Sequence, residues 1–312
     1  MKKKLAIVLG GGGARGAMQV GALRALFEAG IKPDLLVGTS IGSINATGLA
    51  LWGLNLEGIQ ALERLYQRMQ DSKLMDPRLL QFAWNAVSKQ SNQRGSRAAR
   101  EFMIAEGIAP EIRFGQINSV RLATVAADLH TGKSIIYGTD PEHSVMEGVL
   151  ASIAIPPWFA AIEKEDQYII DGGAVSNLPI EPAIKLGATE IIALDVHDPD
   201  VASSANQIVD PLLTKLAFAI IKRELHLEME LAAVHGIPVH YVNLRSSPPV
   251  QTWDFKTHRD LFKIGYDIMK DEMSGWPQKR QPSTEFLQRF TKKLSSAVTQ
   301  TKSRFLNQLQ SE

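Results

Sequence analysis

Three short segments of the chain combine residue types that suit nucleophilic catalysis. The first, Gly10–Gly16, reads GGGGARG. The second, Gly38–Gly42, reads GTSIG, and the third, Asp171–Gly173, reads DGG. A serine can act as a nucleophile, an aspartate as a base, and the backbone amides of a glycine loop can stabilise an oxyanion. The three segments together would suit attack of a serine on an ester.

The glycine loop follows a short apolar run and precedes a helix-like segment. The amides of Gly11, Gly12 and Gly13 can point outward without obstruction by a Cβ, so the loop can hold a phosphate or an oxyanion. A dinucleotide site would need an acidic residue at the end of the second strand, roughly 20 residues later. That strand is instead followed by the segment Gly38–Gly42, so the dinucleotide interpretation is rejected. The Lys-Ser/Thr of a P-loop is also absent.

Ser40 lies between the predicted strand Leu35–Val37 and the predicted helix Ser43–Trp52. The pattern G-x-S-x-G at a strand-to-helix junction is typical of a nucleophile elbow. Gly38 and Gly42 permit the close approach of strand and helix that such a turn needs, and the positive end of the helix would face the serine oxygen. A purely structural glycine turn is the alternative.

Asp171 ends the predicted strand Tyr168–Ile170, and Gly172 and Gly173 follow it. An aspartate at the end of a strand is well placed to reach into a site. Asp-Gly also marks hairpin turns, and this motif taken alone favours the turn.

His197 offers a rival catalytic arrangement. It follows the predicted strand Glu190–Val196, so the chain order Ser40, Asp171, His197 matches the triad order of α/β-hydrolases. Aspartates flank His197 on both sides, which equally fits a residue that caps a strand in a solvated loop. No second cluster of ligands supports a metal site there. The sequence therefore predicts no metal.

The predicted elements alternate in type along the chain, which indicates an α/β fold with a mainly parallel sheet. Strands are predicted at 5–9, 35–37, 121–126, 133–137, 168–170, 190–196 and 238–244, and helices at 17–29, 43–52, 56–69 and 212–231. The segment at about 71–110 is interpreted as a lid-like helical insertion. The aromatic run Phe82–Trp84 and the helical stretch Leu212–Ile221 could wall an acyl groove.

The overall composition is that of a globular protein. The chain has 312 residues, of which 45% are hydrophobic and 21% charged, and its net charge is +1. This balance excludes global disorder and a purely electrostatic nucleic-acid binder. With no cysteine, disulfides, thiolate metal sites and a cysteine nucleophile are excluded. The apolar run after Lys2–Lys4 is too short for a signal peptide, and no run has transmembrane length. We expect a cytoplasmic protein with at most peripheral membrane contact.

The last part of the chain has its own character. We predict a boundary near residue 276 and a basic amphipathic helix after it, so that 1–275 forms the α/β domain. From Lys279 to Glu312 there are seven basic and two acidic residues, a net charge of +5. Apolar residues recur there at spacings of three or four. This stripe could dock on the protein's own core, on a second subunit in a homo-oligomer, or, through 283–312, on an anionic membrane.

In combination, GGGARG, GTSIG and a distant DGG resemble the patatin-like phospholipases, a family of serine lipid acyl hydrolases. The stretch ASIAIP at 151–156 resembles the segment before that family's aspartate. The resemblance covers roughly residues 5 to 244 and does not obviously include the tail. It implies a three-layer α/β/α fold with a mainly parallel central sheet.

The resemblance also implies roles for residues of this chain. Ser40 corresponds to the nucleophile and Asp171 to the general base, here with glycine as the third residue of the motif. Gly11, Gly12 and Gly13 correspond to the oxyanion hole. Supporting positions are Arg15, which could order the loop or meet a substrate phosphate, and the glycines Gly16, Gly38, Gly42, Gly172 and Gly173.

The implied activity is hydrolysis of fatty acyl esters, such as those of a phospholipid or lysophospholipid, by a Ser-Asp dyad without a cofactor. Aspartate is a weak base in water, with a reference pKa near 3.9, so we expect burial to raise its pKa. Two alternatives stay open: a lipid transacylase with the same dyad, and a lipid-binding regulatory module with little turnover.

Overall fold

The structure is a computed structural model that describes residues 3–72, 74–75, 89–156, 158–164, 166–203 and 211–276. The chain divides into two compact units, Met1–Ser274 and Gly275–Glu312. The fold below is that of the first unit. The predicted amphipathic helix at 283–312 and the aromatic run Phe82–Trp84 lie outside the described residues.

An eight-stranded sheet forms the centre of the first unit, in the order β5-β6-β3-β2-β1-β7-β8 with β4 also paired to β3. The strands β8, β7, β1, β2 and β3 run parallel to one another, whereas β4 and β6 pair antiparallel with β3, and β5 pairs antiparallel with β6. The strands are β1 (Leu5–Leu9), β2 (Leu35–Thr39), β3 (Arg121–Asp128), β4 (Lys133–Tyr137), β5 (Ile162–Lys164), β6 (Gln167–Asp171), β7 (Glu190–Asp195) and β8 (Val239–Asn243). The predicted α/β class with a mainly parallel sheet is confirmed.

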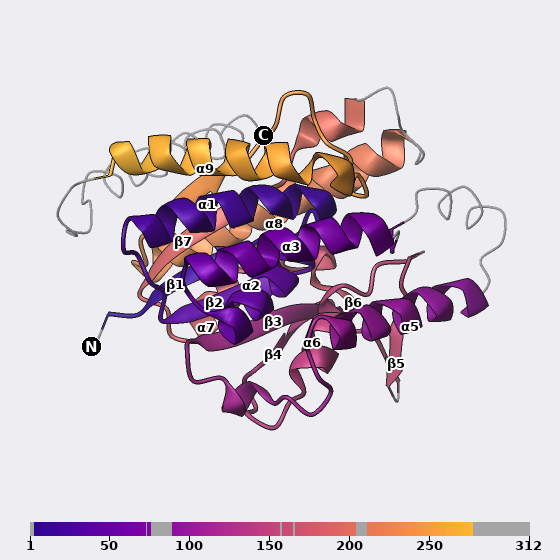
Figure 1. The fold of residues 1–312 in the computed structure, drawn as a ribbon. Coiled ribbons are helices and arrows are strands. Elements are labelled where there is room, and N and C mark those ends of the chain that lie inside the picture. The colour runs from indigo at the N-terminus through magenta and orange to yellow at the C-terminus, as the bar shows by residue number, and fades with distance from the viewer. Residues whose placement is uncertain are drawn as a thin grey trace, which may run out of the picture. The chain divides into compact units, whose positions relative to one another are not determined.

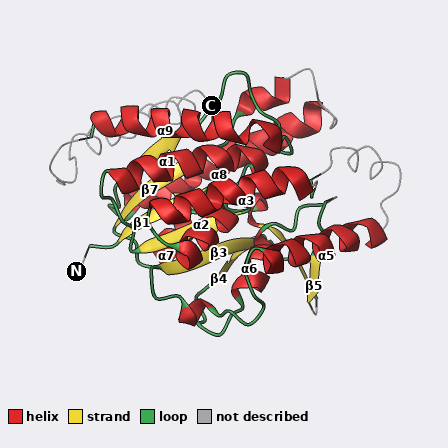
Figure 2. Ribbon diagram, in the orientation of Figure 1, coloured by secondary structure: helices red, strands yellow, loops and turns green. Residues whose placement is uncertain are grey.

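Helices cover the sheet. They are α1 (Gly16–Glu28), α2 (Ile41–Trp52), α3 (Leu56–Ser72), α5 (Lys89–Ala105), α6 (Val145–Ser152), α7 (Ile180–Lys185), α8 (Pro211–Val234) and α9 (His258–Ser274). Figures 1 and 2 show α1, α3 and α9 running side by side, and α1 contacts both of the others. Helices α7 and α8 contact each other, and α7 packs on β1, β2 and β7. Among the described helices, none is both long and apolar enough to cross a bilayer.

The core follows the alternation of side chains along each strand. Ala6 and Val8 of β1 belong to a buried cluster that includes Ile180 of α7 and Ala232 of α8. Every residue of β2 is buried. Burial on both faces explains why the central strands read as continuous apolar runs.

Three features differ from, or add to, the sequence interpretation. Strand β6 is followed by a short 3-10 helix, Gly172–Ala174, and then by α7, so the hairpin turn considered for Asp-Gly is wrong. Helix α2 begins at Ile41 rather than Ser43, which places Ser40 directly before it. Helix α5 accounts for the described half of the segment at about 71–110.

Candidate active site

Ser40 sits at a sharp turn between β2 and α2. Its backbone angles are φ 55° and ψ −126°, and among the described residues it is the one non-glycine residue with positive φ. Such a conformation costs about 1–3 kcal/mol. A Cβ at Gly38 would lie 2.2 Å from the carbonyl oxygen of Gly42, and a Cβ at Gly42 would lie 2.1 Å from that of Leu9. The turn therefore has the tight, strained geometry of a nucleophile elbow.

One long strand brings Ser40 and Asp171 to the same place. Strand β3 pairs through its first five residues with β2 and through its last three with β6. Strand β4 pairs with the other edge of β3, so β2 and β6 lie end to end along one edge. Thr39 is opposite Val125, and Asp171 is opposite the next residue, Ala126. The carboxyl ends of β2 and β6 therefore meet beside Ser40.

The carboxylate of Asp171 is buried, and the residue is 6% exposed. Its Oδ1 accepts a hydrogen bond from the Gly173 amide at 2.7 Å. Its Oδ2 is buried and has no hydrogen-bond partner among the described residues. The side chain of Ser40, which lies nearby, lowers the pKa of Asp171. Burial has the larger effect and raises this pKa to about 6. A carboxylate with a raised pKa and an unengaged oxygen is a better base than an aspartate in water.

The glycine loop presents amides near this pair. A Cβ at Gly11 would lie 3.1 Å from the Cβ of Ser40, so the loop runs beside the serine. The Gly11 amide donates to the carbonyl oxygen of Asn177 at 3.0 Å. In the described part of the chain, the amides of Gly12 and Gly13 donate to no acceptor. Two of the three amides expected to hold an oxyanion are therefore unengaged.

Arg15 is buried and holds two other loops in place. Its Nε donates to the carbonyl oxygen of Val196 and its Nη1 to that of Val250, each at 3.0 Å. Burial lowers the pKa of Arg15 to about 10, partly opposed by the charges of Asp198 and Asp195. These contacts join the glycine loop to the segments that contain Val196 and Val250.

His197 lies in the same pocket but is held differently. Its ring packs edge-on against Phe218, with the ring centroids 4.7 Å apart, and burial lowers its pKa. Its amide donates to Asp195 Oδ1 at 2.8 Å. No hydrogen bond in the described part of the chain joins its ring to Ser40 or Asp171. The same part contains no group of three His, Asp or Glu side chains arranged for a metal ion.

A pocket of about 380 Å³ contains the site. Most of its lining is apolar, from α2, α3, α5, α8 and the segment around Ile155. The predicted site residues that line it are Gly11, Gly12, Gly13, Arg15, Ser40, Asp171 and Gly173. The other four, Gly16, Gly38, Gly42 and Gly172, do not line it and belong to the turns that support it. A larger hollow of about 720 Å³ beside α1, α3 and α9 contains none of the three motifs.

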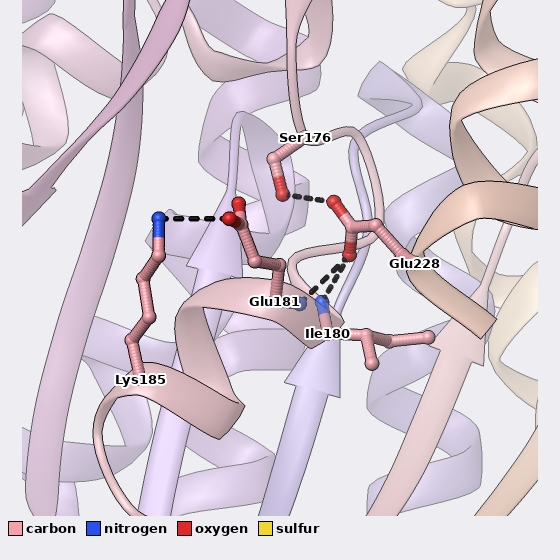
Figure 3. Close-up of polar contacts among 5 residues, drawn as sticks. All are labelled: Ser176, Ile180, Glu181, Lys185 and Glu228. Carbon is pink, nitrogen blue, oxygen red and sulfur yellow. Dashed lines mark hydrogen bonds and ion pairs between the residues drawn. The ribbon is translucent and has the colours of Figure 1, made fainter. Parts of the chain in front are cut away.

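Two glutamates of α8, the buried Glu228 and the half-buried Glu224, hold the segment that follows the DGG motif. Glu228 Oε1 accepts from the Ser176 hydroxyl at 2.5 Å, and its Oε2 accepts from the amides of Ile180 at 2.6 Å and Glu181 at 3.0 Å (Figure 3). One turn earlier, Glu224 Oε1 accepts from the Asn177 amide at 2.5 Å. Figure 3 also shows the ion pair between Glu181 and Lys185 on the short helix α7.

The sequence analysis missed several residues that position the site. Ser152 Oγ accepts from the Ser40 amide at 2.9 Å and donates to the Val125 carbonyl oxygen at 2.6 Å. Asn177 and the two glutamates of α8 were also missed. Ser152 lies within the ASIAIP stretch, and the glutamates stand four residues apart, on one face of the predicted helix 212–231. Those were the signals that could have found them.

The fold and the site define an α/β protein with a strained serine at a strand-to-helix turn, beside a buried aspartate. Residues 7–184, more than half of the chain, match the family model of the patatin-like phospholipases. The chain therefore belongs to the patatin-like phospholipase family, and the resemblance inferred from the three motifs is confirmed.

Curated relatives are longer than this chain. Patatin-like phospholipase domain-containing protein 7 of Rattus norvegicus is 30% identical over 208 residues, 65% of this chain and 14% of that protein. Patatin-like phospholipase domain-containing protein 6 of Homo sapiens is 25% identical over 298 residues, 87% of this chain and 20% of that protein. An uncharacterized NTE family protein of Mycobacterium tuberculosis is 29% identical over 216 residues, 68% of this chain and 33% of that protein. The chain spans a third or less of the length of these relatives.

Solved structures give more distant matches. VipD from Legionella pneumophila is 16% identical, with a TM-score of 0.47, over 88% of this chain and 67% of that chain. ExoU from Pseudomonas aeruginosa, in its complex with SpcU, is 15% identical, with a TM-score of 0.41, over 89% of this chain and 53% of that chain.

Proposed function

We propose that this protein is a serine lipid acyl hydrolase that cleaves fatty acyl esters through an acyl-enzyme on Ser40. The observation that supports this most is the pairing of Ser40 with Asp171 where β2 and β6 meet, at the wall of an apolar pocket. A carboxylate of raised pKa beside a strained serine suits proton transfer, and apolar walls suit an acyl chain.

In the first half of the proposed reaction, Ser40 Oγ attacks the ester carbonyl carbon and forms a new C–O bond. Its proton passes to the Asp171 carboxylate, and the negative charge that develops on the carbonyl oxygen is held by the amides of Gly12 and Gly13. One such donor is worth about 2.7–4 kcal/mol. When the intermediate collapses, the ester C–O bond breaks and the leaving alcohol takes the proton from Asp171.

In the second half, water attacks the acyl-enzyme and gives one proton to Asp171. The Ser40–acyl bond then breaks, Ser40 regains a proton from Asp171, and the fatty acid leaves. Two alternatives share this site. If an alcohol attacked the acyl-enzyme in place of water, the protein would be a transacylase. If the site bound lipid without cleaving it, the protein would be a lipid-binding module.

The first test is hydrolysis of p-nitrophenyl esters from C4 to C16 by the wild type, Ser40→Ala, Asp171→Asn and His197→Ala. We expect the first two variants to lose activity by about 10²-fold or more and His197→Ala to keep it. Loss in a folded His197→Ala would instead support the triad. If the wild type neither hydrolyses any ester nor reacts at Ser40 with a fluorophosphonate, the hydrolase proposal is wrong. Diversion of product from free acid by an added acyl acceptor would identify the transacylase.

A further inference from the structure

Helix α8 presents two apolar faces. On one, Ala217, Phe218 and Ile221 line the pocket that contains Ser40. On the other, Leu216 is 55% exposed and Ile220 is 53% exposed. The same face continues in both directions, because Leu212, four residues before Leu216, and Leu227, seven after Ile220, are 73% and 47% exposed.

This exposure is concentrated and not scattered. Nine large apolar side chains are exposed in the described part of the chain, and four of them form this one stripe, Leu212, Leu216, Ile220 and Leu227. Single exposed leucines are normal on protein surfaces, whereas an apolar patch with a polar rim marks a contact surface. We call these four residues the α8 stripe.

The exposed charges between Leu212 and Leu227 are all basic, and the exposed Glu230 lies one turn beyond Leu227. Lys215, Lys222 and Arg223 are exposed on the same length of helix. Between Leu212 and Leu227 the single acidic residue is Glu224, which is half-buried and accepts a hydrogen bond from the Asn177 amide. A basic amphipathic helix face is typical of binding to anionic lipid.

Charge also argues against two other candidates for covering the α8 stripe, the tail of this chain and a second copy of it. The tail from Lys279 to Glu312 carries a net charge of +5, so it would meet the basic face with like charge. In a two-fold symmetric dimer that buried this face, the lysines of one copy would approach those of the other. Anionic lipid is the occupant whose charge is complementary.

The α8 stripe lies on the helix that also lines the catalytic pocket. A shallow groove of about 480 Å³ lies beside Ile220 and Leu227 of the stripe. It is lined on the α8 side also by Arg223 and by the half-buried Glu224, and on the other side by Ala174 and Val175. Ala174 also lines the pocket that contains Ser40. The groove and the catalytic pocket therefore share Ala174 in their walls, and α8 lines both of them.

We propose that the α8 stripe, with Lys215, Lys222 and Arg223, docks the protein on anionic lipid membranes and sets the acyl pocket at the lipid surface. The benefit of this arrangement rests on the proposed hydrolase function, but the docking itself does not require turnover. The docking surface thus lies within the α/β unit and is distinct from the segment 283–312.

The test measures binding of the full chain to vesicles. One set is pure phosphatidylcholine, and in the other about one lipid in three is phosphatidylglycerol. Using the Ser40→Ala background separates binding from hydrolysis. We expect binding to the anionic vesicles to fall by about tenfold or more in the double variant Leu216→Gln/Ile220→Gln and in Lys222→Glu/Arg223→Glu. Leu56→Gln, at an exposed leucine of α3, is the matched control and should bind as before.

Hydrolysis of a C4 ester is measured with the same substitutions on an intact Ser40, and it should be unchanged because none of these side chains lines the catalytic pocket. Full anionic binding by both double variants would overturn the proposal and point to 283–312. The proposal would also be overturned if the wild type did not bind anionic vesicles. The same holds if the wild type were a dimer and the Leu216→Gln/Ile220→Gln variant a monomer. A failed C4 assay with stripe-dependent binding would contradict the hydrolase function alone.

Discussion

The Gly11 amide donates to the carbonyl oxygen of Asn177 at 3.0 Å, and the side-chain amide of Asn177 donates back to the carbonyl oxygen of Gly11 at 3.4 Å. This pair joins the glycine loop to the segment after the DGG motif. Because the Glu224 carboxylate accepts from the Asn177 amide, the chain of contacts continues into α8. The loop whose amides are proposed to hold the oxyanion is therefore fixed from a helix that also lines the pocket.

The pH dependence of activity should follow Asp171. The proposed base works only when ionised, and burial raises its pKa to about 6. We expect kcat/KM on a soluble ester to be level near neutral pH and to fall about tenfold per pH unit below about pH 6. A profile that stays level down to about pH 4, with the protein still folded by circular dichroism, would contradict Asp171 as the base.

Replacing Ser40 by glycine should relieve strain that alanine keeps. At φ 55° a residue with a Cβ is strained by about 1–3 kcal/mol, whereas glycine is not strained. The greater freedom of glycine in the unfolded chain offsets about 0.5–1 kcal/mol of this gain in stability. We expect Ser40→Gly to unfold with a free energy about 1 kcal/mol larger than Ser40→Ala in urea. Both variants lose the hydroxyl, so equal stabilities would mean that the turn stores no strain.

Replacing Glu224 by glutamine should stabilise the protein at alkaline pH. Burial, together with the charge of Glu228, raises the pKa of Glu224 from 4.5 to about 8. Since the folded state holds this proton more tightly than the unfolded state, the free energy of unfolding falls as pH rises from about 4.5 to about 8. Glutamine keeps the oxygen that accepts from Asn177 and does not titrate. Its advantage in thermal unfolding should therefore grow across this window, and parallel stability curves would contradict the shift.

Glu228 should matter through its oxygens and not through its charge. Glu228→Leu would leave the Ser176 hydroxyl and the amides of Ile180 and Glu181 unpaired, at about 1–3 kcal/mol for each buried group. We expect the free energy of unfolding to fall by about 3 kcal/mol or more. A drop in kcat should accompany it, because the Ser176 carbonyl oxygen accepts from the Thr39 hydroxyl next to Ser40 at 2.8 Å.

Glu228→Gln is the matched control. Its oxygen can accept from the two amides while its NH₂ group donates to Ser176 Oγ, so most of the stability and kcat should return. If the glutamine variant is as impaired as the leucine variant, the charge of Glu228 is required and this account is wrong.

The sequence by itself determined the class of fold and the family. Apolar runs alternating with helical segments gave the α/β class, because strands buried on both faces must be apolar throughout. The segments GGGGARG, GTSIG and DGG could be recognised because their chemistry depends on residue types close together in the chain. Glycine at position 38 is required by a contact with the backbone of Gly42, and such a local constraint is visible in a short stretch of sequence. Glycine at position 42 instead approaches the backbone of Leu9 in β1, a contact that the fold creates.

Only the tertiary structure decided how these segments meet. The pairing of β2 and β6 end to end along β3 brings Asp171 to Ser40, and no local pattern encodes which strands become neighbours. The raised pKa of Asp171 is a property of its burial, which depends on residues from many parts of the chain. The role of Glu224 and Glu228 in α8 could not be predicted from the sequence for the same reason. Their hydrogen-bond partners are about 50 residues away in sequence and are brought close only by packing.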